Sequence, residues 1–278
     1  MILSPATKLY GVVGDPVGHS LSPLIHNRWI REAGIDAVYV ALHLQSSDAE
    51  ADLRALARAN FSGLNVTLPH KAAALKSAAS ASPDAKLIGA ANTLARETGP
   101  VWTAYNTDTD GFSLALTHVL SGDPRGRRVV LIGAGGAARA AAYGLARLGV
   151  ELAIVNRSKA NADALVKELA LHAETADLGE LNTYAERADI VVNSASLGHA
   201  GVGLPQLPAG KGRSFLDLSY GRAAKDTLAA AKAAGWAPHD GLRMLVGQAA
   251  AAFKIWFGLS PDIDGALGAC EAIVAVRR

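Results

Sequence analysis

The sequence predicts an α/β protein with two successive α/β regions, and three observations lead to this prediction. Apolar stretches rich in β-branched residues alternate with stretches of helical periodicity, as in βαβ units. The alternation occurs twice, before and after a Gly- and Pro-containing segment at residues 121–127. The 278 residues suffice for two ordinary domains, and half of them are hydrophobic while only 5% are aromatic.

The first region is predicted from short apolar runs separated by helical segments. Three strands are expected at KLYGVVG (8–14), AVYVALHL (37–44) and GLNVTLP (63–69), with helices at 23–33, 48–59 and 71–79. Two shorter strands are expected around 91–95 and 101–106. A helix from Asp108 to about Leu120 follows, because Phe112, Leu116 and Leu120 recur on one face.

The second region repeats the pattern. Strands are expected at RVVLIG (128–133), ELAIVN (151–156), DIVVNSA (189–195) and SFLDLS (214–219), and helices at 136–148, 158–170 and 223–234. Two apolar helices, roughly 242–257 and 262–275, close the chain.

Composition and net charge argue against several kinds of binding partner and against a bound metal. The net charge of +2 argues against a nucleic-acid or membrane-surface partner. Cys270 is the single cysteine, so the sequence offers no disulfide framework, and the eight histidines show no metal-ligand spacing. The N-terminal residues lack the order of a signal peptide, and no apolar run reaches membrane-spanning length. We therefore expect a cytoplasmic protein without a bound metal.

A glycine-rich turn follows the first strand of the second region. Strand 129–132 ends at Gly133, and a helix starts just after Gly135 and Gly136. Glycines at this spacing allow a tight turn and let backbone N–H groups approach a pyrophosphate at the helix N-terminus. The strand–turn–helix–strand context predicts a Rossmann-type, doubly wound dinucleotide-binding domain. Its pyrophosphate cradle would comprise Gly133, Ala134, Gly135, Gly136, Ala137 and Ala138.

The end of the next strand indicates which dinucleotide binds. NAD sites usually carry an acidic residue there, but this chain has Asn156, 23 positions after Gly133. Arg157 can bind a 2′-phosphate with two hydrogen bonds, and Ser158 and Lys159 can add a hydroxyl and a second charge. The sequence thus favours NADP over NAD. Lys159 could instead lie on the first turn of an exposed helix.

Two serines precede the first predicted helix, in GDPVGHSLSPLIHN (14–27). Ser22, followed by Pro23, is expected to be the N-cap of that helix. Capping does not account for Ser20, and a loop serine beside a helix N-terminus is well placed to hydrogen-bond an anion.

Polar residues also follow other predicted strands of the first region. NVTLPHK supplies Asn65, Thr67 and Lys71, GAANTL supplies Asn92, and YNTDTDG supplies Asp108. Ligands of open α/β sheets bind beyond the carboxyl ends of strands, so these groups could meet on one rim. A hydride-transfer enzyme also needs a partner for the carbinol proton, and a lysine paired with a carboxylate can supply it. Lys71 and Asp108 are the candidates. The alternatives are an exposed lysine and an aspartate that caps helix 108–120.

These motifs together resemble the shikimate dehydrogenase family. The matching segments run in the family's order over almost the whole chain: SLSPLIHN, NVTLPHK, GAANT, NTDTDG, GAGGAARA, NRS, NSASLG, DLSY and MLVGQAAAAFKIW. The resemblance implies NADPH-dependent, reversible reduction of 3-dehydroshikimate to shikimate. It also implies a substrate domain of residues 1–107 plus 243–278, to which the C-terminal helices return, and an NADP domain of residues 108–242.

The resemblance further implies roles for individual residues. Ser20 and Ser22 would bind the substrate carboxylate, with Tyr220 near that end, and Lys71 and Asp108 would form the catalytic pair. The ring hydroxyls would be held by Asn65, Thr67, Asn92 and Gln248, and the cofactor would be contacted by the cradle, residues 156–159, Ser194 and Gly241. Gln248 could instead be a surface residue of its Ala-rich helix, and Tyr220 could pack on the core.

Departures from the family pattern concern the cofactor side. Ser158 replaces a common threonine, His199 replaces a common methionine, and Gly241–Leu242 replaces a common Gly-Met pair. Two other interpretations stay open: a quinate/shikimate dehydrogenase of broader substrate and cofactor use, and a nucleotide-binding regulator without catalysis. Under each of these interpretations, we expect the protein to act on or bind a small molecule, as a monomer or homodimer.

Overall fold

The computed structural model describes residues 4–195 and 205–276, which divide into two compact units. The first unit comprises the residues up to Thr107 together with Leu245–Cys270, and the second comprises Asp108–Met244 and the residues from Glu271 onward. Helices α11 (Leu242–Phe257) and α12 (Ile263–Val276) therefore both pass from one unit to the other. Residues 243–278 were all predicted to belong with the first region.

The first unit is built on a mixed six-stranded sheet with the order β2-β1-β3-β5-β6-β4. The strands β2, β1 and β3 are parallel, whereas β5 runs antiparallel to both β3 and β6. Its elements before α11 are β1 (Lys8–Gly14), α1 (Ser22–Glu32), β2 (Ala37–His43), α2 (Ala49–Arg58), β3 (Phe61–Val66), α3 (Lys71–Ser77), β4 (Ser80–Ala81), α4 (Pro83–Ile88), β5 (Thr93–Ala95) and β6 (Thr103–Tyr105).

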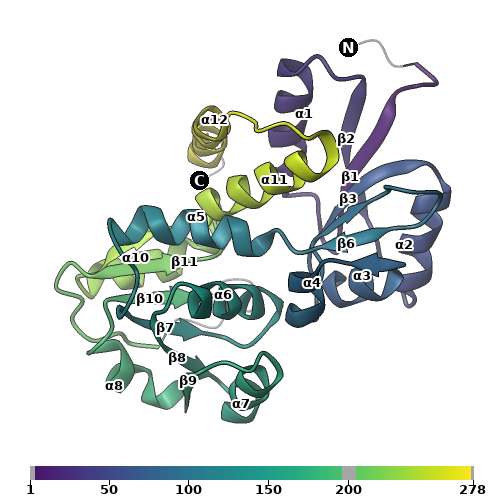
Figure 1. Cartoon of the computed structure of the whole chain (residues 1–278). Helices are drawn as coiled ribbons and strands as arrows, with labels where there is room; N and C mark the ends of the chain where they lie inside the picture. The colour runs from purple at the N-terminus through teal and green to yellow at the C-terminus, as the bar shows by residue number, and fades with distance from the viewer. Residues whose placement is uncertain (1–3, 196–204, 277–278) are drawn as a thin grey trace. The chain divides into compact units, whose positions relative to one another are not determined.

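Alternation along β1 and β3 sorts their side chains onto the two faces of this sheet. Val13 and Leu64 point to the face covered by α2 and α3, where they pack with Leu53 and Ala74 (Figure 1). Tyr10 points to the other face, where its ring lies 5.1 Å from that of Trp256 in α11. The first unit thus buries both faces of its sheet.

Helix α11 is anchored to the first unit by Trp256. Its indole Nε1 donates to the Leu94 carbonyl at 3.1 Å. The indole lies so close to β3 that a Cβ on Gly63 would come within 2.5 Å of Nε1, so only glycine fits there. The predicted return of the C-terminal helices to the first domain is confirmed for α11.

Within the described residues, no helix is both long enough and apolar enough to cross a membrane.

The second unit is a doubly wound parallel sheet with the order β12-β11-β10-β7-β8-β9. Counted along the chain, this is the 3-2-1-4-5-6 order of Rossmann domains, so the predicted fold class is confirmed. Its elements are α5 (Asp108–Leu120), β7 (Arg128–Ile132), α6 (Gly136–Arg147), β8 (Glu151–Asn156), α7 (Lys159–Glu168), β9 (Ala173–Asp177), α8 (Leu181–Ala185), β10 (Ile190–Asn193), β11 (Ser214–Asp217), α10 (Lys225–Ala233) and β12 (Ala237–His239), with 3-10 turns at Leu178–Glu180 and Gly221–Ala223.

Both edge strands of the second sheet, β9 and β12, were missed by the sequence analysis. Ala176 is the one buried residue of β9, so the strand lacks an apolar run that a pattern could detect. β12 is three residues long and contains Pro238, a residue that sheets accept at their edges.

A buried histidine lies between α1 and the sheet of the first unit. The His26 ring is fully buried and stacks on the Tyr39 ring at 4.3 Å, with Trp29 and Trp256 around it. Neither ring nitrogen makes a hydrogen bond within normal limits. Burial lowers the pKa of His26 from 6.5 to about 3, although the nearby Asn65 side chain opposes the shift. The ring is therefore neutral in the folded protein at physiological pH.

This depressed pKa predicts a loss of stability in mild acid. Between pH 6.5 and about 3 the unfolded chain binds a proton at His26 that the folded chain does not. The free energy of unfolding should therefore fall by about 1.4 kcal/mol per pH unit in this window on account of His26. Urea unfolding at pH 7, 6 and 5, followed by tryptophan fluorescence, should show a shallower decline for His26→Phe than for the parent. Equal declines would contradict the prediction, and His19→Gln in an exposed loop is the control.

Candidate functional site

The serine-containing loop is held by hydrogen bonds at the start of α1. The helix begins at Ser22, with Leu21 at the N-cap, so the prediction that Ser22 is the N-cap was wrong. The Ser20 hydroxyl instead accepts a hydrogen bond from the Ser22 backbone N–H at 3.2 Å. This bond gives one N–H of the first turn a partner and leaves the Ser22 side chain buried, 3% exposed, against Tyr39.

Asn92 is the hub of a buried polar network in the first unit. Its Oδ1 accepts from the Thr107 N–H at 2.7 Å, and its Nδ2 donates to Thr107 Oγ1 at 3.0 Å and to Gln248 Oε1 at 3.2 Å. Gln248 is 8% exposed, so it is a buried member of the network rather than a surface residue of α11. The backbone carbonyl of Asn92 also accepts from the Val66 N–H at 2.8 Å.

Asn65 belongs to the same network. Its Nδ2 donates to Thr93 Oγ1 at 3.1 Å and to the Asn92 carbonyl at 3.3 Å. Its Oδ1 accepts from the Tyr39 hydroxyl at 2.7 Å. The structure therefore brings together the three amide side chains predicted to bind substrate: those of Asn65, Asn92 and Gln248.

Lys71 and Thr67 lie on the segments that surround this network. Lys71 is the first residue of α3, and its carbonyl accepts from the N–H of Ala91, the neighbour of Asn92, at 3.0 Å. The Thr67 N–H donates to the Val13 carbonyl at 2.8 Å, just past the end of β3. Asp108 is the first residue of α5 in the second unit and is 5% exposed.

The glycine turn of the second unit has the geometry that a pyrophosphate site requires. Gly133 has φ +111°, and a Cβ on it would lie 2.7 Å from Ser194 Oγ, so this position needs glycine. Gly135 and Gly136 face open space at the start of α6. Gly135 offers no side-chain cap, so N–H groups of the first turn remain available to an anion. Ala138 is fully buried and packs against the sheet, so alanine serves at the third glycine position.

Ser194 and Gly241 lie at the carboxyl end of this sheet. Ser194 follows β10, and its hydroxyl donates to the Ile132 carbonyl of the adjacent β7 at 2.6 Å. A Cβ on Gly241 would come within 2.1 Å of the Leu218 carbonyl oxygen. Tyr220 is half-buried in the segment that follows β11. His199 lies outside the described residues.

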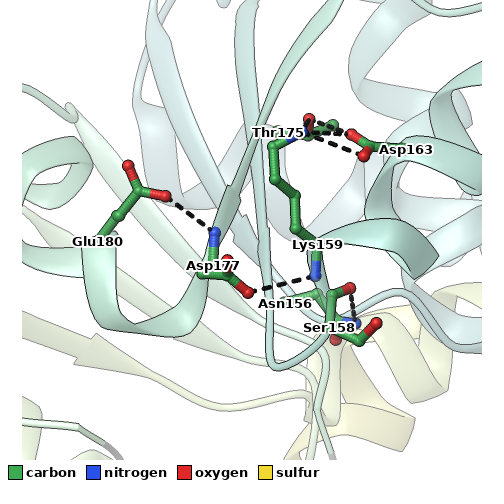
Figure 2. A network of polar contacts seen from close by, with 7 residues as sticks. All are labelled: Asn156, Ser158, Lys159, Asp163, Thr175, Asp177 and Glu180. Carbon is green, nitrogen blue, oxygen red and sulfur yellow. Dashed lines mark hydrogen bonds and ion pairs between the residues drawn. The ribbon is translucent and has the colours of Figure 1, made fainter.

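At the end of β8, Lys159 is already engaged by acidic neighbours (Figure 2). Its ammonium donates to Asp163 at 2.8 Å and to the Thr175 hydroxyl at 3.0 Å, and Thr175 in turn contacts Asp163. The hydrogen bond that Lys159 donates to Asp163 raises the pKa of Lys159, and the negative charges of Asp163, Asp177 and Glu180 add to this rise. Lys159 is therefore the counter-ion of Asp163 within its own unit.

Asp177 is a carboxylate that the sequence analysis did not anticipate at this place. It ends β9 in register with Asn156, and its Oδ1 accepts from the Lys159 backbone N–H at 3.3 Å. It also caps the turn at Leu178–Glu180. Asn156 donates to the Ser158 carbonyl at 2.9 Å, and the Arg157 side chain is exposed. Arg157 is thus the basic residue here with no salt bridge to a described acidic side chain.

Comparison with known proteins assigns both units. Three family models match in order along the chain: the shikimate dehydrogenase substrate binding domain over residues 12–94, shikimate/quinate 5-dehydrogenase over 115–232, and the shikimate 5′-dehydrogenase C-terminal domain over 241–270. The chain belongs to the shikimate dehydrogenase family.

Relatives and solved structures of this family match at nearly full length. A shikimate dehydrogenase (NADP+) of Hyphomonas neptunium is 46% identical over 96% of this chain and 98% of its own. A Thermus thermophilus shikimate 5-dehydrogenase, solved with NADP(H) and shikimate, has a TM-score of 0.80 at 34% identity and covers 95% of this chain and 99% of its own. A Listeria monocytogenes shikimate 5-dehydrogenase, solved with shikimate and NAD, has a TM-score of 0.81 at 29% identity and covers 95% of this chain and 96% of its own.

The family models cover the candidate residues unevenly. The substrate-binding model includes both serines, Lys71 and Asn92, and the C-terminal model includes Gln248. Asp108 falls between the first two models, so the prediction for it rests on the NTDTDG motif alone.

The engagement of Lys159 generates a prediction about dinucleotide preference. Lys159→Met should lower the ratio of kcat/KM with NADP to that with NAD by about twofold to fivefold, because Asp163 then loses its counter-ion. Adding Asp163→Asn should restore the ratio. Steady-state kinetics with each dinucleotide measure it, and Lys167→Met at the other end of α7 is the matched control. A double variant as impaired as Lys159→Met would mean that Lys159 binds the phosphate directly.

Proposed function

We propose that this protein catalyses the reversible, NADPH-dependent reduction of 3-dehydroshikimate to shikimate. The observation that carries the proposal is 46% identity to a shikimate dehydrogenase (NADP+) over 96% of this chain. Shikimate and its 3-dehydro form have a carboxylate at one end of a ring that carries hydroxyl groups. We assign recognition of that substrate to residues 1–107 plus 243–278, and cofactor binding to residues 108–242.

The second unit fits NADP on two observations. The open space at Gly135 and Gly136 and the uncapped start of α6 suit a pyrophosphate, and the exposed Arg157 suits a 2′-phosphate. Bound NADPH supplies the hydride. Ser158 can add a hydroxyl hydrogen bond at the ribose, whereas Lys159 contributes by neutralising Asp163. Ser194 and Gly241, at the carboxyl end of the sheet, are proposed to border the nicotinamide.

The first unit offers both kinds of group that such a ring requires. Ser20 and Ser22, at the start of α1, are proposed to bind the carboxylate, which is favoured at a helix N-terminus, with Tyr220 at the same end of the ring. Asn65, Asn92 and Gln248, with Thr67 beside them, are proposed to bind the ring hydroxyls. Since the network already orients these amides, they need little reorganisation when the substrate arrives.

Lys71 and Asp108 are proposed to handle the proton. The Lys71 ammonium would donate a proton to the oxygen at the reduced carbon, and the Asp108 carboxylate would hold the ammonium in position and balance its charge. Each residue is the first of its helix, so the backbone position of each side chain is fixed by regular structure.

The remaining partner assignments are also part of the proposal. We expect the protein to act as a cytoplasmic monomer or homodimer on this small substrate, without a nucleic-acid or membrane partner.

Activity should be selective for one substrate and cofactor combination. Shikimate and quinate, each assayed with NADP+ and NAD+, should give the highest kcat/KM for shikimate with NADP+. Comparable turnover of quinate with NAD+ would instead indicate an enzyme of broader use. Lack of turnover in all four assays would contradict the proposed function.

Lys71→Ala should lower kcat by about a hundredfold to ten-thousandfold, because general acid–base catalysis contributes on that scale. Shikimate affinity, measured by titration without turnover, should change by only a small factor, because the ammonium acts mainly in the transition state. Lys76→Ala, in the same helix, is the control. Near-normal turnover of Lys71→Ala would remove this residue from the mechanism.

Arg157→Ala should raise the KM for NADP+ by about tenfold to a hundredfold, the scale of a lost hydrogen bond between charged groups. The KM for NAD+, which lacks the 2′-phosphate, should stay within about twofold. Equal losses for the two dinucleotides would show that Arg157 does not recognise the phosphate.

A further inference from the structure

Tyr39 is a buried residue of the first unit that the proposed mechanism does not use. It lies on β2 with 2% of its surface exposed, and burial raises its pKa well above the ordinary value, so its hydroxyl stays protonated. The side chain reaches across β1, since β2 and β3 both pair with β1 and not with each other. Its hydroxyl ends 2.7 Å from Asn65 Oδ1.

The hydrogen bonds of Asn65 allow one orientation of its amide. A backbone carbonyl can only accept, so the contact with the Asn92 carbonyl must be made by Asn65 Nδ2. The second Nδ2 proton goes to Thr93 Oγ1. The Oδ1 atom must then face Tyr39, and the Tyr39 hydroxyl must be the donor. Both protons of the Asn65 amide are therefore used within the protein.

The position of the Tyr39 ring is itself fixed by packing. The His26 ring stacks on it at 4.3 Å with an interplanar angle of 11°, and Trp256 lies 6.2 Å away. The Ser22 side chain also lies near the Tyr39 hydroxyl, where it opposes the rise in the pKa of Tyr39 that burial causes. The phenolic oxygen thus contacts the end of β3, at Asn65, and lies near the start of α1, at Ser22, two segments that we assign to the substrate.

We propose that Tyr39 is a positioning residue for substrate recognition, acting through Asn65. This inference rests on the proposed function. The Tyr39 hydroxyl holds the Asn65 amide in one orientation, with both Nδ2 protons bound within the protein. A ligand can then bind this amide only by donating a hydrogen bond to the second lone pair of Oδ1. Asn65 then serves as an acceptor for a hydroxyl of the substrate ring, and a keto oxygen at that place would be disfavoured because it brings no proton.

The test is a double-mutant cycle between Tyr39 and Asn65. Tyr39→Phe keeps the ring and the stacking on His26 and removes one hydroxyl. It should raise the Kd and KM for shikimate by about threefold to tenfold, the scale of one hydrogen bond, with kcat and the KM for NADP+ within about twofold. In an Asn65→Ala background, Tyr39→Phe should change the Kd for shikimate by less than about 1.5-fold, because its route of action is gone.

The matched control is Tyr10→Phe. Tyr10 is likewise buried, on the adjacent strand of the same sheet, and its hydroxyl interacts with Ser62 rather than with a proposed binding residue. Thermal midpoints of all variants show whether a loss of stability accompanies each change. A shikimate Kd unchanged in Tyr39→Phe, or raised equally in Tyr10→Phe, would overturn the proposal. So would a Tyr39→Phe effect that persists in full with Asn65→Ala, because it would then act through another group such as Ser22.

These outcomes are separable from failure of the proposed function. If the parent protein neither binds nor turns over shikimate, the proposed function is wrong and the positioning role falls with it. If the parent is active and the cycle shows no coupling, the positioning role alone is wrong.

Discussion

The first unit depends on one requirement: each buried amide side chain must find hydrogen-bond partners among its neighbours. Asn92 contacts Gln248, which lies 156 positions away in the sequence, and a network member left without its partner would cost about 1–3 kcal/mol. Correct docking of α11 is therefore a condition for completing the network, and the indole of Trp256 against Gly63 sets that docking. Packing and hydrogen bonding favour the same arrangement, so the folded protein itself orients the amides of this unit.

The second unit meets a different constraint, close approach of the backbone at the point where strand order reverses. β7 lies between β8 and β10, so strand order reverses at the turn after β7, which is where open α/β sheets bind their ligands. Gly133 is required there because Ser194 occupies the space of a side chain. The Ser194 hydroxyl, which follows β10, donates to the Ile132 carbonyl of β7 and so stabilises the turn.

The fold class, the central strands and the residues within motifs could be predicted from the sequence, because each is determined by a short contiguous segment. Strand 128–133 and the glycine turn are contiguous, and so are Ser20 and Ser22. The sequence could not reveal the pairing of Tyr39 with Asn65, which joins strands on opposite sides of β1 and depends on their register. Asp177 escaped for a related reason, since β9 is an edge strand with one buried residue and was not recognised as a neighbour of β8. The N-cap prediction for Ser22 failed because Ser20 supplies the hydrogen bond to the first turn.

The two units thus recognise their proposed ligands by different physics. In the first, the neutral amides are buried and hydrogen-bonded to one another. The proposed selectivity for a polyhydroxylated ring would come from the direction of these donors and acceptors, which salt screens little. In the second, Arg157, Lys159 and Asp163 are exposed, so their charges act through water and are screened by salt. Under the proposed assignment, substrate identity is tied to the folded core of one unit, whereas preference between dinucleotides depends on a surface charge balance. A charge balance of that kind can shift with one substitution while the substrate network and the fold stay intact.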